Sequence, residues 1–356
     1  MNKFGFILHP LSAADVGRRY PIAKYFPPSW VEGVCGRMSS KFLGHIHNLR
    51  GDTGAAADGC FVGCPLTPRQ FTEWPVEQGY ERILQAVDMA ARWGAKIVGL
   101  GAFTAVVGDK GVTIAERSGV GITTGNSYTV YTAVEGAIDA ARRMGIEPSE
   151  SRAAILGATG SIGRACALLL GNDVASLSLV GRRPGALSDI ADEVKQATSA
   201  DADCYTDVGE GTRDADIVIA VTSAVESIIE PEHVKSGAVV CDVARPRNAS
   251  RALIETRNDV LVIDGGAVAV PGENFDFGFD FGFPAGLAYA CMAETMILGL
   301  EGRYENYSLG AEMKLEQVQE MGELAAKHGF RLSGYRCLER TLTDEDIAQK
   351  REAGGR

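Results

Sequence analysis

The sequence predicts an α/β protein built from an N-terminal α/β domain, a doubly wound parallel sheet and C-terminal helices. Three observations support this fold class. The chain has 356 residues, of which 46% are hydrophobic and 23% charged, as in a globular protein with two or three domains. Short apolar runs alternate with helix-length segments through the middle of the chain. Glycine is frequent, at 43 residues, and many glycines directly follow an apolar run.

The first part of the chain is expected to form a substrate-binding α/β domain over residues 1–148. Apolar residues at helical spacing predict helices over residues 76–93 and 128–144, and a glycine follows each of them. Short buried strands are expected over residues 4–8 and 96–100.

The middle of the chain, residues 149–284, repeats strand, crossover and strand more regularly. Such repeats imply right-handed crossovers and a parallel sheet covered by helices on both faces. The strands expected in this domain are residues 153–156, 177–180, 217–221, 238–243 and 260–263.

The last part of the chain is expected to return to the N-terminal domain. A glycine and phenylalanine run over residues 275–283 would either line an apolar channel or be a loop held by its aromatic rings. Helices over 287–300 and 312–328 follow, and residues 285–330 would pack back on the N-terminal domain. The charged tail, 331–356, is expected to be largely disordered.

The composition excludes several classes of protein. The formal net charge of −11 argues against a protein that coats nucleic acid or an anionic membrane, although a local basic patch would be compatible with it. The N-terminus lacks the features of a secretory signal, and no stretch approaches the ~18 apolar residues of a membrane span. Eight scattered cysteines are typical of reduced thiols. We therefore expect a cytoplasmic protein without nucleic acid or stable membrane insertion.

A glycine-rich turn follows the first strand of the middle domain and opens a helix. In this setting glycines let the backbone approach a pyrophosphate, whose charge faces the helix N-terminus, as in a Rossmann-type domain. The alternative is a tight turn that binds nothing. The residues expected to contact a dinucleotide are Gly157, Ala158, Thr159, Gly160, Ser161, Ile162 and Gly163.

The next strand ends in Arg182 and Arg183. Arginine at this position accommodates the 2′-phosphate of NADP, whereas an NAD site usually carries an acidic residue there. The sequence therefore indicates NADPH as the cofactor, with a solvated basic turn as the alternative.

Three residues are candidates for catalysis. Cys291 lies at the start of a predicted helix, where the helix dipole stabilises a thiolate, although a small buried thiol is the simpler interpretation from composition alone. Thr124 and Asn126 offer donors at a strand-to-helix turn, suited to a substrate carbonyl or to helix capping.

No metal site is expected. His45 and His47 with Cys60 and Cys64 match no closed zinc spacing, and alternation along a strand explains the histidines equally well.

Five segments together resemble the cyanobacterial long-chain acyl-[acyl-carrier-protein] reductases. The similarity extends from about residue 4 to residue 330. Departures place the chain in a diverged branch: Tyr128 stands where that family has histidine, Ser161 where it has an acidic residue, and the phenylalanine-rich run differs. The matching segments are residues 101–104, 123–126, 157–163, 290–302 and 327–330.

This resemblance implies NADPH-dependent reduction of a fatty acyl thioester to a fatty aldehyde, with Cys291 as the nucleophile that holds the acyl group. The thioester would be carried by acyl carrier protein or coenzyme A, and an aldehyde-consuming enzyme would be a partner. An acidic carrier would need a basic patch, at Arg18, Arg19 and Lys24 or at Arg142 and Arg143.

Two other functions remain open at this stage. The order of domains also fits a shikimate-dehydrogenase-like oxidoreductase acting on an alcohol and ketone pair, although the catalytic Lys–Asp pair of that fold is not evident. A non-catalytic NADP-binding protein is the third possibility.

Overall fold

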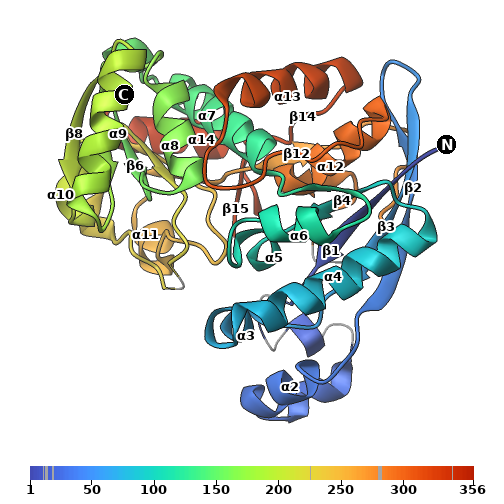
Figure 1. The fold of residues 1–356 in the computed structure, drawn as a ribbon. Coiled ribbons are helices and arrows are strands. Elements are labelled where there is room, and N and C mark those ends of the chain that lie inside the picture. Colours follow the sequence, from blue (N-terminus) through green and yellow to red (C-terminus); the bar gives the residue numbers. More distant parts are fainter. Residues whose placement is uncertain (11, 13–14, 18–19, 225, 280–282, 339) are drawn as a thin grey trace. The chain divides into compact units, whose positions relative to one another are not determined.

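The computed structural model describes residues 1–356 except 11, 13–14, 18–19, 225, 280–282 and 339 (Figure 1). The chain forms two compact units. Unit 1 comprises residues 1–126, 269–312 and 323–331, and unit 2 comprises residues 127–268, 313–322 and 332–356. The chain passes from unit 1 to unit 2 at the start of α7 (Asn126–Arg143) and first returns to unit 1 at residue 269. It enters unit 2 again at residue 313, crosses back within α13 (Leu315–His328) and ends in unit 2 from residue 332.

Unit 1 contains a five-stranded sheet in the order β2-β3-β1-β4-β5. β1, β3, β4 and β5 run parallel, and β2 pairs antiparallel with β3 at the edge. The strands are β1 (Asn2–Leu8), β2 (Lys41–Arg50), β3 (Ala56–Gly63), β4 (Ile97–Leu100) and β5 (Gly121–Thr123).

Two long helices cover opposite faces of this sheet. Side chains alternate along β1, so Ile7 packs with the residues of α4 (Val76–Trp93), while Phe4 and Phe6 point to the other face. That second face receives α12 (Ala290–Glu301), which contacts β1 and β4. Gly99 permits the close approach, because a Cβ there would overlap the side chain of Thr295.

The remaining elements of unit 1 are short. They include η1 (Pro21–Tyr25), α2 (Pro28–Cys35), α3 (Pro68–Glu73), α5 (Phe103–Val106), α6 (Val112–Arg117) and β13 (Leu287–Tyr289). Two further strands, β12 (Ala267–Ala269) and β14 (Arg331–Leu332), lie where the chain passes between the units.

Unit 2 contains a six-stranded sheet in the order β11-β10-β9-β6-β7-β8, with every neighbouring pair parallel. This is the Rossmann strand order, 3-2-1-4-5-6 read from the other edge. The predicted α/β fold class with a doubly wound parallel sheet is therefore confirmed. The strands are β6 (Arg152–Leu156), β7 (Ser176–Val180), β8 (Asp201–Tyr205), β9 (Ile217–Ala220), β10 (Val239–Asp242) and β11 (Leu261–Asp264).

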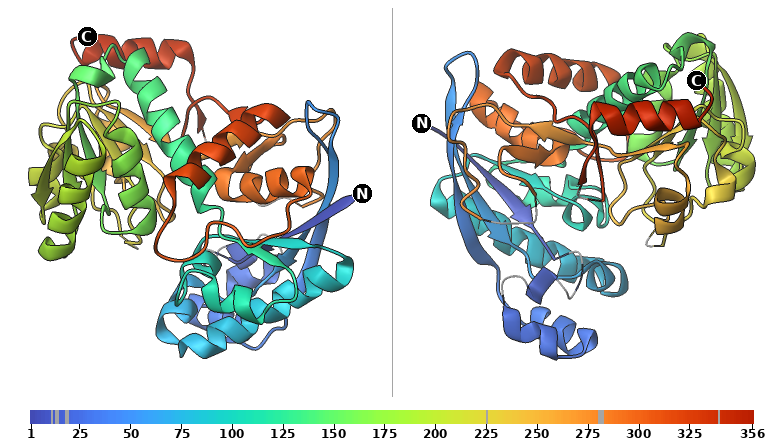
Figure 2. Two further views of the ribbon diagram at one scale, coloured as in Figure 1. Left: turned by 45° about the horizontal axis from the view of Figure 1, so that its top comes forward. Right: turned by 180° about the vertical axis from the view of Figure 1, so that it is seen from behind.

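Helices cover both faces of this sheet (Figures 1 and 2). One buried cluster joins α7, α8 (Ser161–Leu170) and α9 (Pro184–Ala197) to alternate residues of the strands, and α11 (Arg251–Thr256) packs on the other face. Short elements complete the unit: η2 (Pro148–Glu150), α10 (Val208–Thr212), η3 (Pro231–His233), β15 (Arg336–Cys337), β16 (Arg340–Thr341) and α14 (Asp344–Ala353). None of the helices in the described part of the chain is long and apolar enough to cross a membrane.

The C-terminal tail was expected to be largely disordered, and this prediction is wrong. Residues 332–356 carry β15, β16 and α14, with Ile347 buried. Charged side chains attach this segment to the body of unit 2: Arg143 pairs with Asp344 at 2.8 Å, and Lys350 donates to the carbonyl of Val260 at 3.0 Å. Several charged side chains of this segment thus form ion pairs or hydrogen bonds with unit 2. Composition alone cannot distinguish such paired charges from charges that are exposed to solvent.

The glycine and phenylalanine run contacts the sheet of unit 1. Phe277 is buried with its ring centroid 5.6 Å from that of Phe61 on β3, and Asp276 exchanges backbone hydrogen bonds with His47 on β2. Of the two interpretations offered for this run, the contacts correspond to a loop held by aromatic packing. Residues 280–282 of the run lie outside the described residues.

Candidate functional site

Cys291 is the second residue of α12, at its N-terminal turn. Every other residue from Ala290 to Leu300 is buried, whereas Cys291 is partly exposed. Of the other cysteines, six are buried and Cys204 is exposed on β8. Burial raises the pKa of the thiols at Cys60 and Cys166 to about 12, so the buried cysteines are poor nucleophiles. Among the eight thiols, Cys291 alone combines access with a helix N-terminus.

The loop after β5 lies directly against this cysteine. Gly125 has φ +75°, and a Cβ there would lie closer than 3 Å to the Cα, Cβ and carbonyl oxygen of Cys291. Glycine is therefore required at residue 125 both by the left-handed backbone and by the contact with Cys291.

A buried carboxylate connects α12 to the same loop. Thr123, at the end of β5, donates its hydroxyl proton to Glu294, which is fully buried one turn after Cys291. The same Thr123 oxygen accepts a hydrogen bond from the backbone N–H of Gly125 at 3.3 Å. From the sequence, Glu294 would either orient a group near the thiol or form an ion pair; in the structure its carboxyl group accepts a hydrogen bond from the hydroxyl of Thr123.

The other two predicted catalytic residues differ in their surroundings. Thr124 is buried, and its hydroxyl donates to the carbonyl of Ser308, so its single proton is already engaged. Asn126 is half-buried as the first residue of α7.

His9 lies at the same edge of the sheet, because β1, β4 and β5 are parallel and end together. Its Nδ1 lies 3.0 Å from the carbonyl oxygen of Pro10, and its Nε2 accepts the backbone N–H of Phe103 at 3.0 Å. Burial lowers the pKa of His9 to about 4. The ring is therefore neutral at pH 7, with the proton on Nδ1, and it fixes the loop after β4.

His328 cannot act as a base for Cys291. It is buried at the end of α13, with Nε2 bonded to Glu301 and Nδ1 3.2 Å from Oγ1 of Thr53. Glu301 is ten residues beyond Cys291, about 15 Å along α12 at 1.5 Å per residue. The histidine thus joins α12, α13 and the loop between β2 and β3.

The two histidines and two cysteines considered as metal ligands lie on or directly after two neighbouring strands, β2 and β3. His45 and His47 lie on β2, and His45 is directly opposite Cys60 on β3. Burial raises the pKa of Cys64 to about 11. The described residues contain no group of three His, Cys, Asp or Glu side chains placed to hold a metal ion.

In unit 2, the predicted dinucleotide turn connects β6 to α8. Gly157 has φ +87°, and its N–H and that of Ala158 donate to the carbonyl of Val180 on β7 at 2.9 and 3.1 Å. A Cβ on Gly163 would lie closer than 3 Å to the backbone of Gly157, so the first turn of α8 rests on the glycine turn itself. The start of α8 is therefore the positive end of a helix placed directly after the glycine turn, an arrangement that suits the pyrophosphate of a dinucleotide.

Arg182 and Arg183 follow β7 and are exposed. β7 is the direct neighbour of β6, and Gly181 lies beside the side chain of Thr159 in the glycine turn. Arg182 and Arg183 therefore follow the strand whose carboxyl end lies next to the glycine turn.

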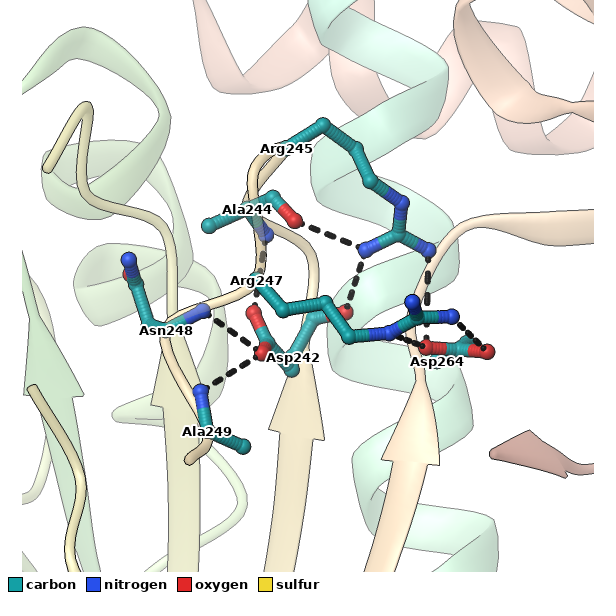
Figure 3. A network of polar contacts seen from close by, with 7 residues as sticks. All are labelled: Asp242, Ala244, Arg245, Arg247, Asn248, Ala249 and Asp264. Atoms are coloured by element: carbon teal, nitrogen blue, oxygen red, sulfur yellow. Dashed lines mark hydrogen bonds and ion pairs between the residues drawn. The ribbon is translucent and has the colours of Figure 1, made fainter. Parts of the chain in front are cut away.

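A polar network at the ends of β10 and β11 was not predicted from the sequence (Figure 3). The carboxylate of Asp242 accepts backbone N–H bonds from Ala244, Asn248 and Ala249 at 2.8–3.1 Å. Burial raises the pKa of Asp242, against the effect of these bonds. One feature of the sequence could have indicated this network: Asp242 is an acidic residue at the end of an otherwise apolar core strand.

Two arginines complete this network (Figure 3). Arg247 makes two bonds of 2.9 Å to Asp264, and Arg245 donates to the carbonyl oxygens of Asp242 and Ala244. Asn248 accepts from the N–H and hydroxyl of Thr222, so the loops after β9 and β10 are held together. Both loops border the carboxyl edge of the sheet, where ligands bind in this fold.

Comparisons with known proteins agree with this division of the chain. The profile of the shikimate / quinate 5-dehydrogenase family matches residues 139–264, which lie within unit 2. Over 350 residues, 92% of this chain, the sequence is 31% identical to aminotransferase PigE of Serratia sp.. The chain spans only 39% of the length of that relative.

A second relative matches along its whole length. The long-chain acyl-[acyl-carrier-protein] reductase of Synechococcus elongatus is 26% identical over 92% of this chain and 98% of its own. Among solved structures, quinate dehydrogenase from Corynebacterium glutamicum in complex with NAD is 12% identical, with a TM-score of 0.40 over 90% of this chain and 98% of its own. The sheet order, the glycine turn and the family match together support an oxidoreductase of Rossmann type that uses a nicotinamide dinucleotide.

Proposed function

We propose that the chain reduces a fatty acyl thioester to a fatty aldehyde through an acyl-Cys291 intermediate, with NADPH as the reductant. The observation that carries this proposal is the position of Cys291, a partly exposed thiol on the first turn of an otherwise buried helix. The similarity to the cyanobacterial reductase supports the same reaction.

Each step can be assigned to groups of this chain. The Cys291 thiolate attacks the thioester carbonyl carbon, the carrier thiolate leaves and takes a proton, and the acyl group stays on sulfur. The bound NADPH would supply a hydride to that carbonyl carbon. The resulting thiohemiacetal loses its hydroxyl proton, the carbon–sulfur bond breaks, and the aldehyde and Cys291 are released.

The negative charge on the carbonyl oxygen needs hydrogen-bond donors close to Cys291. The first turn of α12 is one candidate, because the N–H groups at the start of a helix point outward along its axis, at its positive end. Asn126 is the second candidate donor. Thr124 would help only if its bond to Ser308 were exchanged.

The choice of NADPH over NADH rests on Arg182 and Arg183. Two cationic side chains beside the adenosine end of the turn favour a ligand with an additional phosphate. The turn from Gly157 to Gly163 would hold the pyrophosphate.

The carrier of the acyl group and the consumer of the aldehyde are also part of the proposal. Acyl carrier protein and coenzyme A both present the thioester that Cys291 would attack. An aldehyde is a carbonyl substrate for transamination, so the name of the relative from Serratia fits an aldehyde-consuming partner reaction.

The second candidate function is a dehydrogenase for an alcohol and ketone pair. The family match over residues 139–264 favours it, but those residues belong to the dinucleotide-binding unit and exclude Cys291. Such an enzyme needs no thiol, so alkylation of Cys291 distinguishes the two functions.

The decisive experiment uses wild type, Cys291→Ala and Cys204→Ser, with acyl thioesters of several chain lengths. Without NADPH, wild type and Cys204→Ser should gain the mass of one acyl group, and Cys291→Ala should gain none. With NADPH, we expect aldehyde from the first two proteins and a loss of roughly 10³-fold or more in Cys291→Ala.

Cys204 is a suitable control because it is exposed but lies on β8 in unit 2. Full aldehyde production by Cys291→Ala, or oxidation of an alcohol that is unaffected by iodoacetamide, would refute the proposal.

A further inference from the structure

Five bulky apolar side chains of unit 1 project into solvent from one short segment, residues 21–34. Ile22 is 68% exposed, Tyr25 86%, Phe26 47%, Trp30 68% and Val34 61%. Among the described residues only four other large hydrophobic side chains are exposed to this degree, and they lie scattered along the chain. Figures 1 and 2 show α2, which carries Trp30 and Val34, at the extremity of unit 1.

The exposure follows from how the segment folds. Prolines occupy the first positions of both η1 and α2, where a fixed φ starts a helix. In α2, Val31 and Cys35 are buried, while Trp30 and Val34, four residues apart, share the outer face. The helix therefore has a second apolar face besides the one that packs on unit 1.

The charges around residues 21–34 contrast with those of the rest of the chain. Residues 1–50 contain seven Lys and Arg against two Asp and Glu, within a chain of net charge −11. Lys24, which lies between Ile22 and Tyr25 in the sequence, and Arg37, three residues after Val34, are both exposed. The single acidic residue of the segment, Glu32, faces Arg69 at 3.7 Å.

We propose that residues 21–34 dock unit 1 onto the interfacial region of an anionic lipid bilayer. Trp and Tyr prefer the headgroup level, apolar side chains gain from burial just below it, and Lys and Arg are attracted to anionic headgroups. A partner protein that recognised only the basic charge would leave the five apolar side chains unexplained. The docking is peripheral and does not depend on the proposed function.

The test is co-sedimentation of the full chain with vesicles of phosphatidylcholine, with and without 30% phosphatidylglycerol. We expect binding that is stronger to the anionic vesicles and weakens as salt is added, because screening shortens the reach of Lys24 and Arg37. Tyr25→Ser with Trp30→Ser should weaken binding at least 10-fold. The matched control is Val76→Ser with Val106→Ser, which removes exposed apolar side chains elsewhere in unit 1 and should leave binding unchanged.

Lys24→Glu with Arg37→Glu should remove the preference for anionic vesicles. The inference is overturned if wild type does not sediment with the vesicles, or if the Tyr25 and Trp30 variant binds as well as wild type. Binding of soluble poly-glutamate without vesicle binding would overturn it in favour of an acidic protein partner. Self-association that the Tyr25 and Trp30 variant loses, again without vesicle binding, would overturn it in favour of a second copy of the chain.

Discussion

At the scale of residues, the site around Cys291 depends on a few small groups in close contact. Gly125 brings the loop after β5 against the cysteine, and Thr123 connects that loop to the buried Glu294. A threonine hydroxyl can donate one bond and accept others, which is why it can hold both groups at once.

Replacing Thr123 should therefore affect both stability and the reactivity of Cys291. In Thr123→Val the carboxylate of Glu294 loses a bond in a buried position, so the free energy of unfolding should fall by about 1–3 kcal/mol. The rate of Cys291 acylation should fall roughly 10-fold as the loop loses its anchor. Urea denaturation and mass spectrometry of the acyl-enzyme measure the two effects.

The control for this prediction is Thr123→Ser, which keeps the hydroxyl. It should restore the acylation rate to within a few-fold of wild type. If Thr123→Val acylates as fast as wild type, the Thr123 hydroxyl does not position the site.

At the scale of elements, the loop from β4 to α5 is held in place by hydrogen bonds on both sides of a residue with a strained backbone conformation. His9 accepts the backbone N–H of Phe103, and Thr104 bonds both the N–H and the carbonyl of Gly101. Between them Ala102 has φ +48° and ψ −123°, a conformation that only glycine adopts readily. The loop borders the same sheet edge as Thr123, and strain of this kind is found at functional sites.

Ala102→Gly should raise the free energy of unfolding by about 1 kcal/mol. The gain is the difference between relief of the backbone strain and the larger conformational entropy that glycine has in the unfolded chain. Ala102→Val should lower it, since a β-branched residue tolerates a positive φ less well. Ala102 is exposed, so neither change alters core packing, and a loss of stability in Ala102→Gly would contradict the assignment of strain.

Elements with strong periodicity were the ones that the sequence predicted well. α4 begins and ends where its apolar spacing and Gly94 indicate, and the glycine turn precedes α8 as expected. β8 was missed because it is an edge strand with several exposed residues, so its sequence lacks an apolar run. A strand around His45 and His47 was only one of two interpretations of the sequence, and its pairing with β3 was not predicted, because β2 is a partly exposed edge strand with irregular pairing.

At the scale of the whole molecule, the net charge of −11 is unevenly distributed along the chain. The first fifty residues are basic, while the C-terminal segment places its charges in pairs on unit 2. Arg143, one of the residues expected to attract an acidic carrier, already pairs with Asp139 and Asp344. Arg18 and Arg19, the other expected patch, lie outside the described residues, and Lys24 beside them is exposed.

The stability of the protein should fall as the pH is lowered through the range in which His9 titrates. The pKa of His9 is about 4 in the folded chain, against an ordinary value of 6.5, because of burial. Between these values the unfolded chain binds the proton and the folded chain does not, so acid favours unfolding. The loss should reach up to about 3 kcal/mol by pH 4.

Urea denaturation of wild type and His9→Gln from pH 7.5 to 4.5 measures this contribution. The other four histidines contribute equally to both proteins, so the difference isolates His9. Parallel pH profiles for the two proteins would show that burial does not hold His9 neutral in the folded chain.

The sequence by itself determined the fold class and the position of the glycine turn between a strand and a helix, and it singled out Cys291 as a candidate nucleophile. These features depend on local patterns, namely apolar periodicity, glycines at strand ends and a cysteine at a helix start. Only the tertiary structure decided which groups surround that cysteine. Thr123 and Glu294 are 171 residues apart, the hydroxyl of Thr124 is already bonded to Ser308, and the charged tail is folded. Contacts between distant residues depend on which faces and edges pack together, and short-range sequence patterns carry no information about that.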